Sequence, residues 1–300
     1  MNIQDLEKFI VIAATENMQQ AALELNTSAS VLSKSLKRLE TLLNTELFDR
    51  VGKNIRLNPA GELLRPKAAL LVAQAKQTRA EFNALGHTQQ YRIAGPSILL
   101  FRWASILSHH YNRQQSDAVL RFDTDYEQET LQKVIKGEAD IGLITSVVST
   151  KIPPEMFAVE LESITMRIAA SEFHPAVKNH KARPVKLTLS QLLDYPFAAP
   201  NISPYCGEAR GVGCDGWQNQ LYPRKLEMIV NDYSILSQLV KSGQVLAYLP
   251  EYCLDEWDLI ELQVTDCSYQ CVEKLLLVSW QKDLLTPLVS KSNDNAFLEF

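Results

Sequence analysis

Residues 17–57 read NMQQAALELNTSASVLSKSLKRLETLLNTELFDRVGKNIRL, and this stretch decides the fold of the amino-terminal module. Asn17 and Ser28 are residue types that cap helices, so they predict a short helix over 18–25 and a longer helix from Ser28 onward. Helical spacing of four leucines predicts one buried stripe on the longer helix. These residues are Leu32, Leu36, Leu39 and Leu43.

The flanking sequence completes the module. A first helix is expected over about 5–15, since its apolar residues follow helical spacing. After the third helix, two short β-prone pieces flank Gly52-Lys53-Asn54, which predicts a hairpin tip. Two short helices, a tight turn and a longer helix are typical of a helix-turn-helix, and a basic hairpin behind it is typical of a wing.

The outer face of the third helix carries small polar and basic side chains that suit the major groove of DNA. Ser hydroxyls and Lys34 can meet base edges, whereas Lys37 and Arg38 suit phosphates. Any amphipathic helix has a polar outer face, so the helix alone favours a merely solvated surface; the basic wing favours DNA. The predicted DNA contacts are Ser28, Ala29, Ser30, Ser33, Lys34, Lys37, Arg38, Arg50, Lys53 and Arg56.

Composition bounds the remaining possibilities. The chain has 300 residues, 46% of them apolar and 22% charged, which are globular values that exclude a wholly disordered chain. No apolar run approaches the ~20 residues of a membrane span, and the acidic start does not suit a signal peptide, so the cytoplasm is expected.

The net charge of −5 argues against nucleic acid until the chain is divided. Residues 1–90 hold 11 basic and 9 acidic residues, a net of +2, and the remainder holds a net of −7. Within 28–67 the excess rises to +4, around the third helix and the wing. Such a small excess of positive charge also arises by chance, so the residue pattern has to decide whether this region binds nucleic acid.

A long helix is predicted after the wing. Asn58-Pro59 is a cap followed by proline at the first helical position, and the helix should run to about residue 85, with a kink or frayed first turn at Pro66. Alternating spacings of four and three predict a coiled-coil seam between two chains, although a helix packed on its own domain is the alternative. The seam residues are Leu64, Ala68, Leu71, Ala75, Thr78 and Phe82.

From Tyr91 onward the pattern alternates between strands and helices, which predicts an α/β fold with mostly parallel sheets. About 210 residues exceed one compact sheet, so two subdomains are expected. A strand is expected near 167–170 and a last helix near Thr286. A helix over 232–242 should turn Ile235, Leu236, Leu239 and Val240 inward.

These features together resemble the LysR-type transcriptional regulators. The matching elements are Leu6…Phe9, Ala21-Ala22…Leu25, Leu32-Ser33…Leu36…Arg38-Leu39-Glu40, Leu47-Phe48-Asp49-Arg50 and Leu57-Asn58-Pro59-Ala60-Gly61. The resemblance covers the whole chain and implies a multidomain α and α/β protein.

The resemblance divides the chain into three parts. It implies a winged helix-turn-helix at 1–58, a linker and dimerisation helix at 59–89, and an effector-binding domain at 90–300 that looks like periplasmic binding proteins. Lobe I would be 91–162 with 266–300, and lobe II 163–265, joined by two crossovers.

The chain departs from the family pattern in three places. Ala29-Ser30 stands where the family usually has Gln-Pro, so direct readout should fall to Ser30, Ser33 and Lys34, or to contact of Ala29 with a thymine methyl. Met18 replaces a common aromatic residue, and Asn58 replaces the usual threonine, although asparagine caps a helix equally well.

The resemblance also implies an effector between the lobes, where strands end and helices begin. Helix amino termini favour anions, but none of the residues at these positions is arginine. For each residue a helix cap or turn is the alternative role, and for Asp232 it is the favoured one. The candidate effector residues are Ser97, Ile98, Thr145, Ser146, Asn201, Ile202, Ser203, Asn231 and Tyr248.

The cysteines suggest a further alternative. Cys206 and Cys214 lie where peroxide-sensing members of the family carry a reactive pair, and Arg210 between them can lower a thiol pKa if it lies near. Two reduced cysteines in a glycine-rich loop are the favoured interpretation. The other three cysteines are expected to be structural, with no metal and no cofactor.

The sequence thus predicts a DNA-binding regulator that responds to a small-molecule effector, for which an anion is one option. It would act as a homodimer or homotetramer on a palindromic operator, with RNA polymerase as a partner if it activates. A redox-sensing regulator is the alternative, and a solute-binding protein is disfavoured by the extra amino-terminal module. An enzyme is not expected: no phosphate loop or nucleophile elbow is present, and His109, His110 and His174 suit surface or capping roles.

Overall fold

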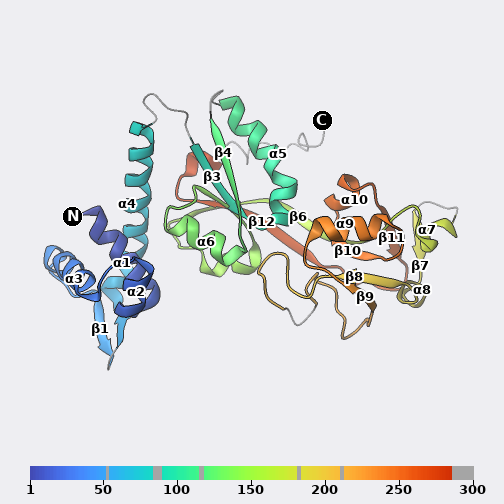
Figure 1. The fold of residues 1–300 in the computed structure, drawn as a ribbon, viewed down its shortest axis with the longest axis horizontal. Coiled ribbons are helices and arrows are strands. Elements are labelled where there is room, and N and C mark those ends of the chain that lie inside the picture. The colour runs from blue at the N-terminus through green and yellow to red at the C-terminus, as the bar shows by residue number, and fades with distance from the viewer. Residues whose placement is uncertain (52–53, 84–89, 115–117, 181–183, 210–212, 286–300) are drawn as a thin grey trace.

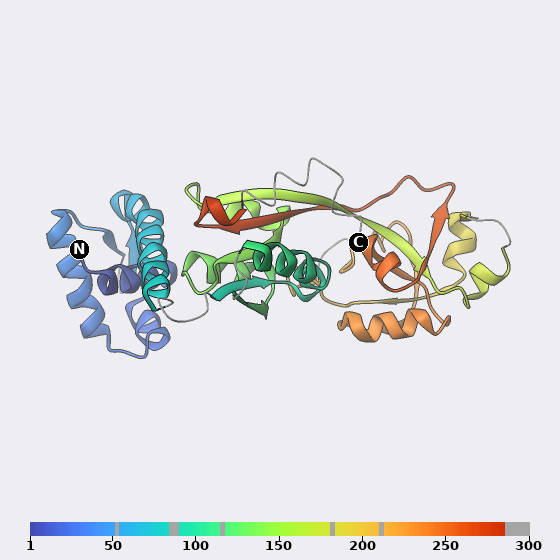
Figure 2. The same cartoon turned by 90° about the horizontal axis from the view of Figure 1, so that it is seen from above.

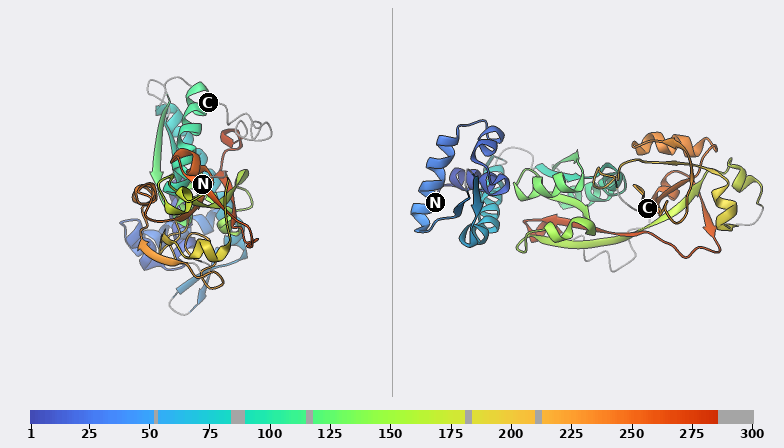
Figure 3. Two further views of the ribbon diagram at one scale, coloured as in Figure 1. Left: turned by 90° about the vertical axis from the view of Figure 1, so that its right-hand side faces the viewer. Right: turned by 90° about the horizontal axis from the view of Figure 1, so that it is seen from below.

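The computed structural model describes residues 1–285 except 52–53, 84–89, 115–117, 181–183 and 210–212. The described parts form a row: a helical unit, then lobe I, then lobe II (Figure 1). The right panel of Figure 3 shows the same row from below, with the helical unit at one end and residues 175–178 and 189–193 of lobe II, drawn in yellow, at the other.

The amino-terminal unit is a winged helix-turn-helix, as predicted. The side chain of Asn17 accepts hydrogen bonds from the backbone N–H groups of Gln19 and Gln20, and that of Ser28 accepts one from Val31. Both predicted caps are therefore confirmed. The elements are α1 (Ile3–Thr15), α2 (Met18–Glu24), α3 (Ala29–Leu43), β1 (Phe48–Val51) and β2 (Asn54–Leu57).

The predicted leucine stripe on α3 is correct for three of its four members. Leu32, Leu36 and Leu39 are buried, but Leu43 is 37% exposed. Leu43 is the last residue of α3, and Asn44 after it takes a left-handed conformation that ends the helix. The stripe therefore stops one turn earlier than the spacing predicts.

The long helix α4 (Pro59–Asn83) begins where the sequence places it, because the Asn58 side chain accepts a hydrogen bond from the Gly61 N–H. The helix continues through Pro66 without interruption. Gly61 has to be small: a Cβ there would lie 2.3 Å from the Leu47 carbonyl oxygen. Ala68 of the predicted seam is buried within the chain, whereas Phe82 is 69% exposed.

Lobe I is built on three parallel strands with helices beside them. β3 lies between β4 and β5, parallel to both. The elements are β3 (Gln90–Gly95), α5 (Ser97–Gln114), β4 (Val119–Thr124), α6 (Glu127–Ile135), β5 (Ile141–Thr145) and the 3-10 helix η1 (Ser146–Lys151).

A long strand, β6 (Phe157–Ala170), passes from lobe I into lobe II. The sequence predicts a strand only for its last four residues, 167–170. β6 pairs antiparallel with β12 (Val272–Ser279) along 157–165 and with two lobe II strands, β10 and β11, beyond that. The prediction of mostly parallel sheets is therefore wrong: the central sheet is mixed, because β6 and β12 both run against their neighbours (Figure 2).

Lobe II surrounds the far end of β6. Its short elements β7, α7, α8 and α10 escape prediction from sequence, since three to five residues show no clear periodicity. Ile235 on α9 is 54% exposed, so its predicted inward orientation is wrong, whereas Leu236 and Val240 are buried. The elements are α7 (Pro175–Lys178), β7 (Val185–Leu187), α8 (Leu189–Leu193), β8 (Pro196–Ala199), β9 (Lys225–Ile229), α9 (Tyr233–Lys241), β10 (Ala247–Pro250), α10 (Tyr252–Glu256) and β11 (Ile260–Val264).

The expected helix at Thr286 lies outside the described residues. Among the helices that are described, none combines the length and apolarity of a membrane span.

His174 serves as a cap, as the sequence suggested. Its Nδ1 accepts a hydrogen bond from the Ala176 N–H at 3.1 Å, and its ring packs edge-on to Tyr195. The side chain is almost fully buried, and this burial lowers the pKa of His174 to about 4. A buried neutral histidine makes stability dependent on pH, because protonation favours the unfolded chain.

We expect the stability of lobe II to fall as the pH drops from about 6.5 toward 4. The unfolded chain takes up a proton at His174 at a higher pH than the folded chain does. Protonation therefore lowers the free energy of unfolding by up to ~3 kcal/mol. His174→Asn keeps a capping acceptor without titrating and should flatten the profile of unfolding free energy against pH. His109→Asn is the control; an equal flattening by both variants would contradict the assignment.

Candidate functional site

The outer face of α3 presents the side chains predicted for DNA contact. Ser30, Ser33, Lys34 and Lys37 are exposed, and Ala29 is half-buried against the core. The face lies at the end of the molecule away from lobe II (Figures 1 and 3). A row of small hydroxyls and two lysines on one exposed helix has the size and the donors that the major groove admits.

Arg38, for which the sequence predicts a phosphate contact, also makes contacts within the chain. Its Nη2 donates to Asp5 Oδ1 at 2.5 Å and its Nε donates to Asp5 Oδ2 at 3.2 Å. Ser35 Oγ donates to the same carboxylate from beneath α3. The hydrogen bond from Arg38 is the main reason that the pKa of Asp5 lies below its ordinary value. Arg38 therefore holds α3 against α1 through Asp5.

Two further carboxylates fasten the hairpin to the helices. Glu40 Oε1 accepts from the Leu47 N–H at 2.9 Å, and Glu16 Oε1 accepts from the Leu57 N–H at 2.8 Å. Sequence reasoning missed these roles, because each partner is a backbone N–H, 7 residues after Glu40 and 41 residues after Glu16, which no helical or strand spacing indicates. Glu40 is part of the motif that carries the family resemblance, and its residue type was the only signal.

The wing presents basic side chains from both of its strands. Arg50 pairs with Ile55 and Arg56 with Asp49 across the two strands, and both arginines are exposed. Exposed arginines beside a helix-turn-helix suit the sugar-phosphate backbone. Lys53, at the predicted tip, lies outside the described residues.

The mouth of the inter-lobe cleft is a pocket of about 410 Å³ at the amino end of α5. Ser97 lines it and is exposed there, the one residue of the predicted effector set to do so in the described structure. Its other walls come from both lobes. They are Pro96, Thr124, Asp125, Tyr126, Glu129 and Pro204.

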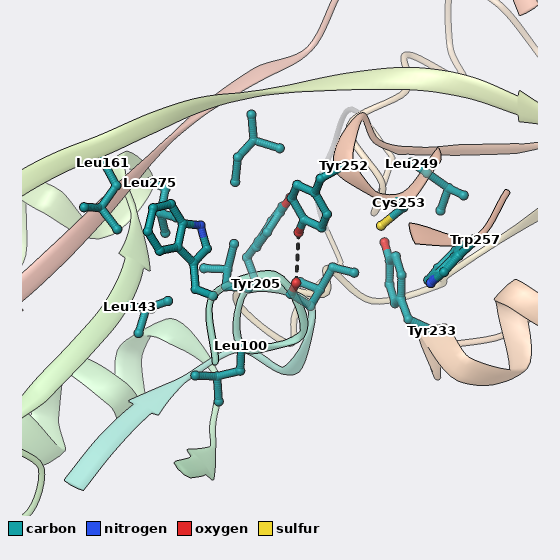
Figure 4. Packing of buried hydrophobic residues seen from close by; sticks show 14 of the residues in the cluster. Leu100, Leu143, Leu161, Tyr205, Tyr233, Leu249, Tyr252, Cys253, Trp257 and Leu275 are labelled. Atoms are coloured by element: carbon teal, nitrogen blue, oxygen red, sulfur yellow. Dashed lines mark hydrogen bonds between the residues drawn. The ribbon is translucent and has the colours of Figure 1, made fainter. Parts of the chain in front are cut away.

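Behind this mouth the cleft is filled by aromatic side chains of lobe II. Tyr205, Tyr233, Tyr252 and Trp257 are buried in one cluster with leucines of lobe I (Figure 4). The Tyr252 hydroxyl donates to the carbonyl oxygen of Ile98 at 2.9 Å, drawn as a dashed line in Figure 4. Burial raises the pKa of these tyrosines, so they stay neutral.

Both hydrogen-bond donors of Thr145 are bound to the carboxylate of Glu127. Its N–H donates to Glu127 Oε2 at 3.2 Å and its hydroxyl donates to the same oxygen at 2.8 Å. The donors that the sequence offers to an effector anion at this strand end are therefore already bound to a carboxylate of the chain. Ser146, which follows Thr145, is half-buried and begins η1.

The remaining predicted residues act mainly as turn formers. Asn231 Oδ1 accepts from the backbone of Asn201 at 3.0 Å and of Ile202 at 3.4 Å. Ser203 Oγ is buried and accepts from the Tyr205 and Cys206 N–H groups. These contacts are those of turn-forming residues, which is the alternative role that the sequence offers for them. The favoured cap is confirmed, since Asp232 accepts from the first turn of α9.

Tyr248 lies in a different cluster, away from Ser97. Its ring packs edge-on to Trp217 at 5.2 Å, and its hydroxyl accepts from the Cys271 N–H at 3.0 Å. A buried ion pair supports this cluster: Arg224 is bidentate with Asp215, and its guanidinium lies over the Trp217 ring. Spacing along the chain carries no sign of this pair, because both residues lie in a loop without periodicity.

Cys206 and Cys214 are half-buried, and none of the five cysteines, all of which lie in the described part of the chain, forms a disulfide. Arg210 lies outside the described residues. Cys253 is buried, and burial raises the pKa of its thiol, which is the opposite of what a reactive cysteine needs. None of these observations specifically supports the redox alternative.

Family models match two regions of the chain. Residues 3–62 match the bacterial regulatory helix-turn-helix protein, lysR family, and residues 85–291 match the LysR substrate binding domain. Among curated proteins, the transcriptional regulator IlvY of Escherichia coli (strain K12) is 23% identical over 264 residues, 85% of this chain and 84% of that protein. GltR of Bacillus subtilis (strain 168) is 26% identical over 183 residues, 60% of each chain.

Solved structures share the fold along the whole chain. CbnR complexed with its target DNA aligns with a TM-score of 0.52 at 16% identity, over 99% of this chain and 100% of that one. A full-length OxyR variant from Pseudomonas aeruginosa aligns with a TM-score of 0.55 at 16% identity, over 97% of this chain and 94% of that one.

The class is therefore that of two-domain regulators with a winged helix-turn-helix and a two-lobed effector-binding domain. The chain belongs to the LysR family, and it is a DNA-binding transcriptional regulator. Its curated relatives are named as transcriptional regulators, and the solved structures of CbnR and of Vibrio fischeri DarR are complexes with DNA.

We expect Asp5→Ala to destabilise the amino-terminal unit by ~2 kcal/mol, because it leaves the buried Ser35 hydroxyl without its acceptor and frees Arg38 from α1. Chemical denaturation followed by circular dichroism measures the loss. Glu24→Ala removes an exposed carboxylate of the same unit and should change stability by less than ~0.5 kcal/mol. Equal effects would show that Asp5 does not hold the helices together.

Proposed function

We propose that the protein reads a palindromic operator as a homodimer or homotetramer in the cytoplasm. Ser30, Ser33 and Lys34 would face base edges, while Lys37, Arg50 and Arg56 would hold phosphates. The observation that carries this proposal is the exposed α3 face beside the two exposed wing arginines. We leave Arg38 out of the phosphate set, because Asp5 engages its guanidinium.

The proposed dimer rests on α4. Its end carries Phe82, a member of the predicted seam that is 69% exposed. A large exposed apolar side chain at the end of a long helix favours a partner helix. Two copies would set two α3 helices one DNA turn apart and so match a palindrome.

Replacing Lys34 and Arg50 together by alanine should weaken operator binding at least tenfold and lower the slope of log affinity against log salt by about 1 to 2 per protomer. Fluorescence anisotropy on the DNA upstream of the protein's own gene measures both quantities.

Lys186→Ala with Lys225→Ala removes the same charge from exposed positions of lobe II and is the matched control. If the control weakens binding as much as the Lys34 and Arg50 pair does, net charge rather than the α3 face and the wing governs affinity. If neither pair matters, the residue assignment is wrong.

We further propose that a small molecule binds at the mouth of the inter-lobe cleft, next to Ser97. The support is the pocket of about 410 Å³, which draws walls from both lobes. A ligand that contacts both lobes changes their relative position, and that change is the physical basis for control of operator binding.

A thermal-shift screen of metabolites against the full-length protein should find a compound that raises the melting temperature. Ser97→Trp should abolish the shift by filling the mouth, because Ser97 lines the pocket. Ser105→Trp places the same ring at an exposed site on the same helix and should leave the shift intact. A shift that survives Ser97→Trp would place the ligand elsewhere.

A further inference from the structure

Helix α6 makes contacts at one end with lobe II and at the other end with α4, the helix that follows the winged helix-turn-helix (the DNA-reading unit). Its nine residues span about 14 Å. In Figure 1 it lies between α4 and the strands of lobe I. Lobe II touches its first turn, and α4 touches the residues just beyond its last turn, so contacts from two separate parts of the chain meet on one short helix.

The first turn of α6 is held by the loop 203–207 of lobe II. The Glu127 backbone N–H donates to the Tyr205 carbonyl oxygen at 2.9 Å, and the Tyr205 ring is 3% exposed. Gly207 lies directly against Tyr126, where a Cβ would approach the ring carbons to 2.6 Å. The loop is therefore fitted closely to the beginning of α6, next to the pocket that Tyr126 lines.

The other end of α6 is held by the linker helix. Lys76 Nζ of α4 donates to the Lys136 carbonyl oxygen at 2.8 Å, which satisfies a carbonyl at the end of α6. Gly137 follows with a φ of +67°, and a Cβ there would lie 3.4 Å from the Ala73 Cα. The two backbones thus approach closely, and Val72 is buried in the same cluster as α6 residues.

Beside this contact the helical unit and lobe I are separated by a groove of about 800 Å³. Because the groove leaves so much of the junction unfilled, close contact near α6 is confined to a narrow area. A small movement of α6 therefore acts on α4 with little else to oppose it. Apolar residues that line the groove include Ile10, Ala13, Leu63, Pro66, Ile135 and Ile152.

We propose that α6 transmits the state of the inter-lobe cleft to the linker helix. When the loop 203–207 withdraws from Tyr126, the first turn of α6 loses its Tyr205 partner. The helix then shifts as a unit, and the contact between Lys76 and Lys136 opens, which releases the DNA-reading unit from lobe I. This inference rests on the proposed function of the cleft, and it adds the route by which the cleft controls α3.

Gly207→Ala in the full-length protein tests the route. The new methyl group collides with the Tyr126 ring, and the φ of +72° strains any residue other than glycine, so the variant disturbs the contact between the loop and Tyr126. Hydrogen exchange of residues 69–76, read by mass spectrometry, should become about 2- to 30-fold faster, the range for mutations along a coupled network.

Gly243→Ala is the matched control. Gly243 has a φ of +78° and its Cβ would lie 3.0 Å from Phe173, but it follows α9 on lobe II, away from α6. It should leave exchange in 69–76 unchanged. If Gly207→Ala speeds exchange only in the loop and the first turn of α6, or if both variants act alike on α4, the route through α6 is wrong.

Lys76→Met provides an independent arm that leaves the cleft intact. It should speed exchange at 69–76 by itself, and Gly207→Ala should then have no further effect on α4 or on operator affinity. Lys67→Met, at an exposed site on the same helix, should do neither. A full additional effect of Gly207→Ala overturns the inference. Failure of the parent protein to bind operator DNA contradicts the proposed function instead, because the exchange measurement does not depend on DNA.

Discussion

The antiparallel pairing of β6 is the constraint on which the rest of the effector domain depends. One strand of 14 residues supplies an edge to β12 in lobe I and to β10 and β11 in lobe II. At ~3.3 Å per residue it spans roughly 45 Å, so it is shared by both lobes. Because the lobes share this strand they stay joined, and any change in the angle between them, as the proposed ligand response would require, has to occur along it.

Between the lobes, polar groups of the chain itself hold the hydrogen bonds that a ligand could otherwise make. Glu127 satisfies Thr145, Tyr252 binds the Ile98 carbonyl, and Tyr205 fills the space between the lobes. A carboxylate ligand entering here would have to displace a carboxylate that is already hydrogen-bonded, and would meet Glu129 and the ion pair between Asp125 and Lys133 at the mouth.

The sequence predicts those features that local periodicity encodes. The caps at Asn17 and Ser28 and the start of α4 at Asn58 follow from residue type, and the exposure of Lys34 follows from spacing. Contacts between distant residues leave no periodic trace. The attachment of Arg38 to Asp5, the insertion of Tyr205 into the cleft, and the mixed sheet all depend on partners far along the chain, so none could be inferred from spacing.

The position of β12 in the sheet also affects how the protein is made. β12 lies between β5 and β6, yet its residues 272–279 are synthesised more than 100 residues after both of those strands. Lobe I therefore stays open on the ribosome until residues 272–279 have been made, while the helices within residues 1–83 rest mainly on local contacts that can form earlier. A nascent chain would thus carry a folded DNA-reading unit before it has a complete domain to control it.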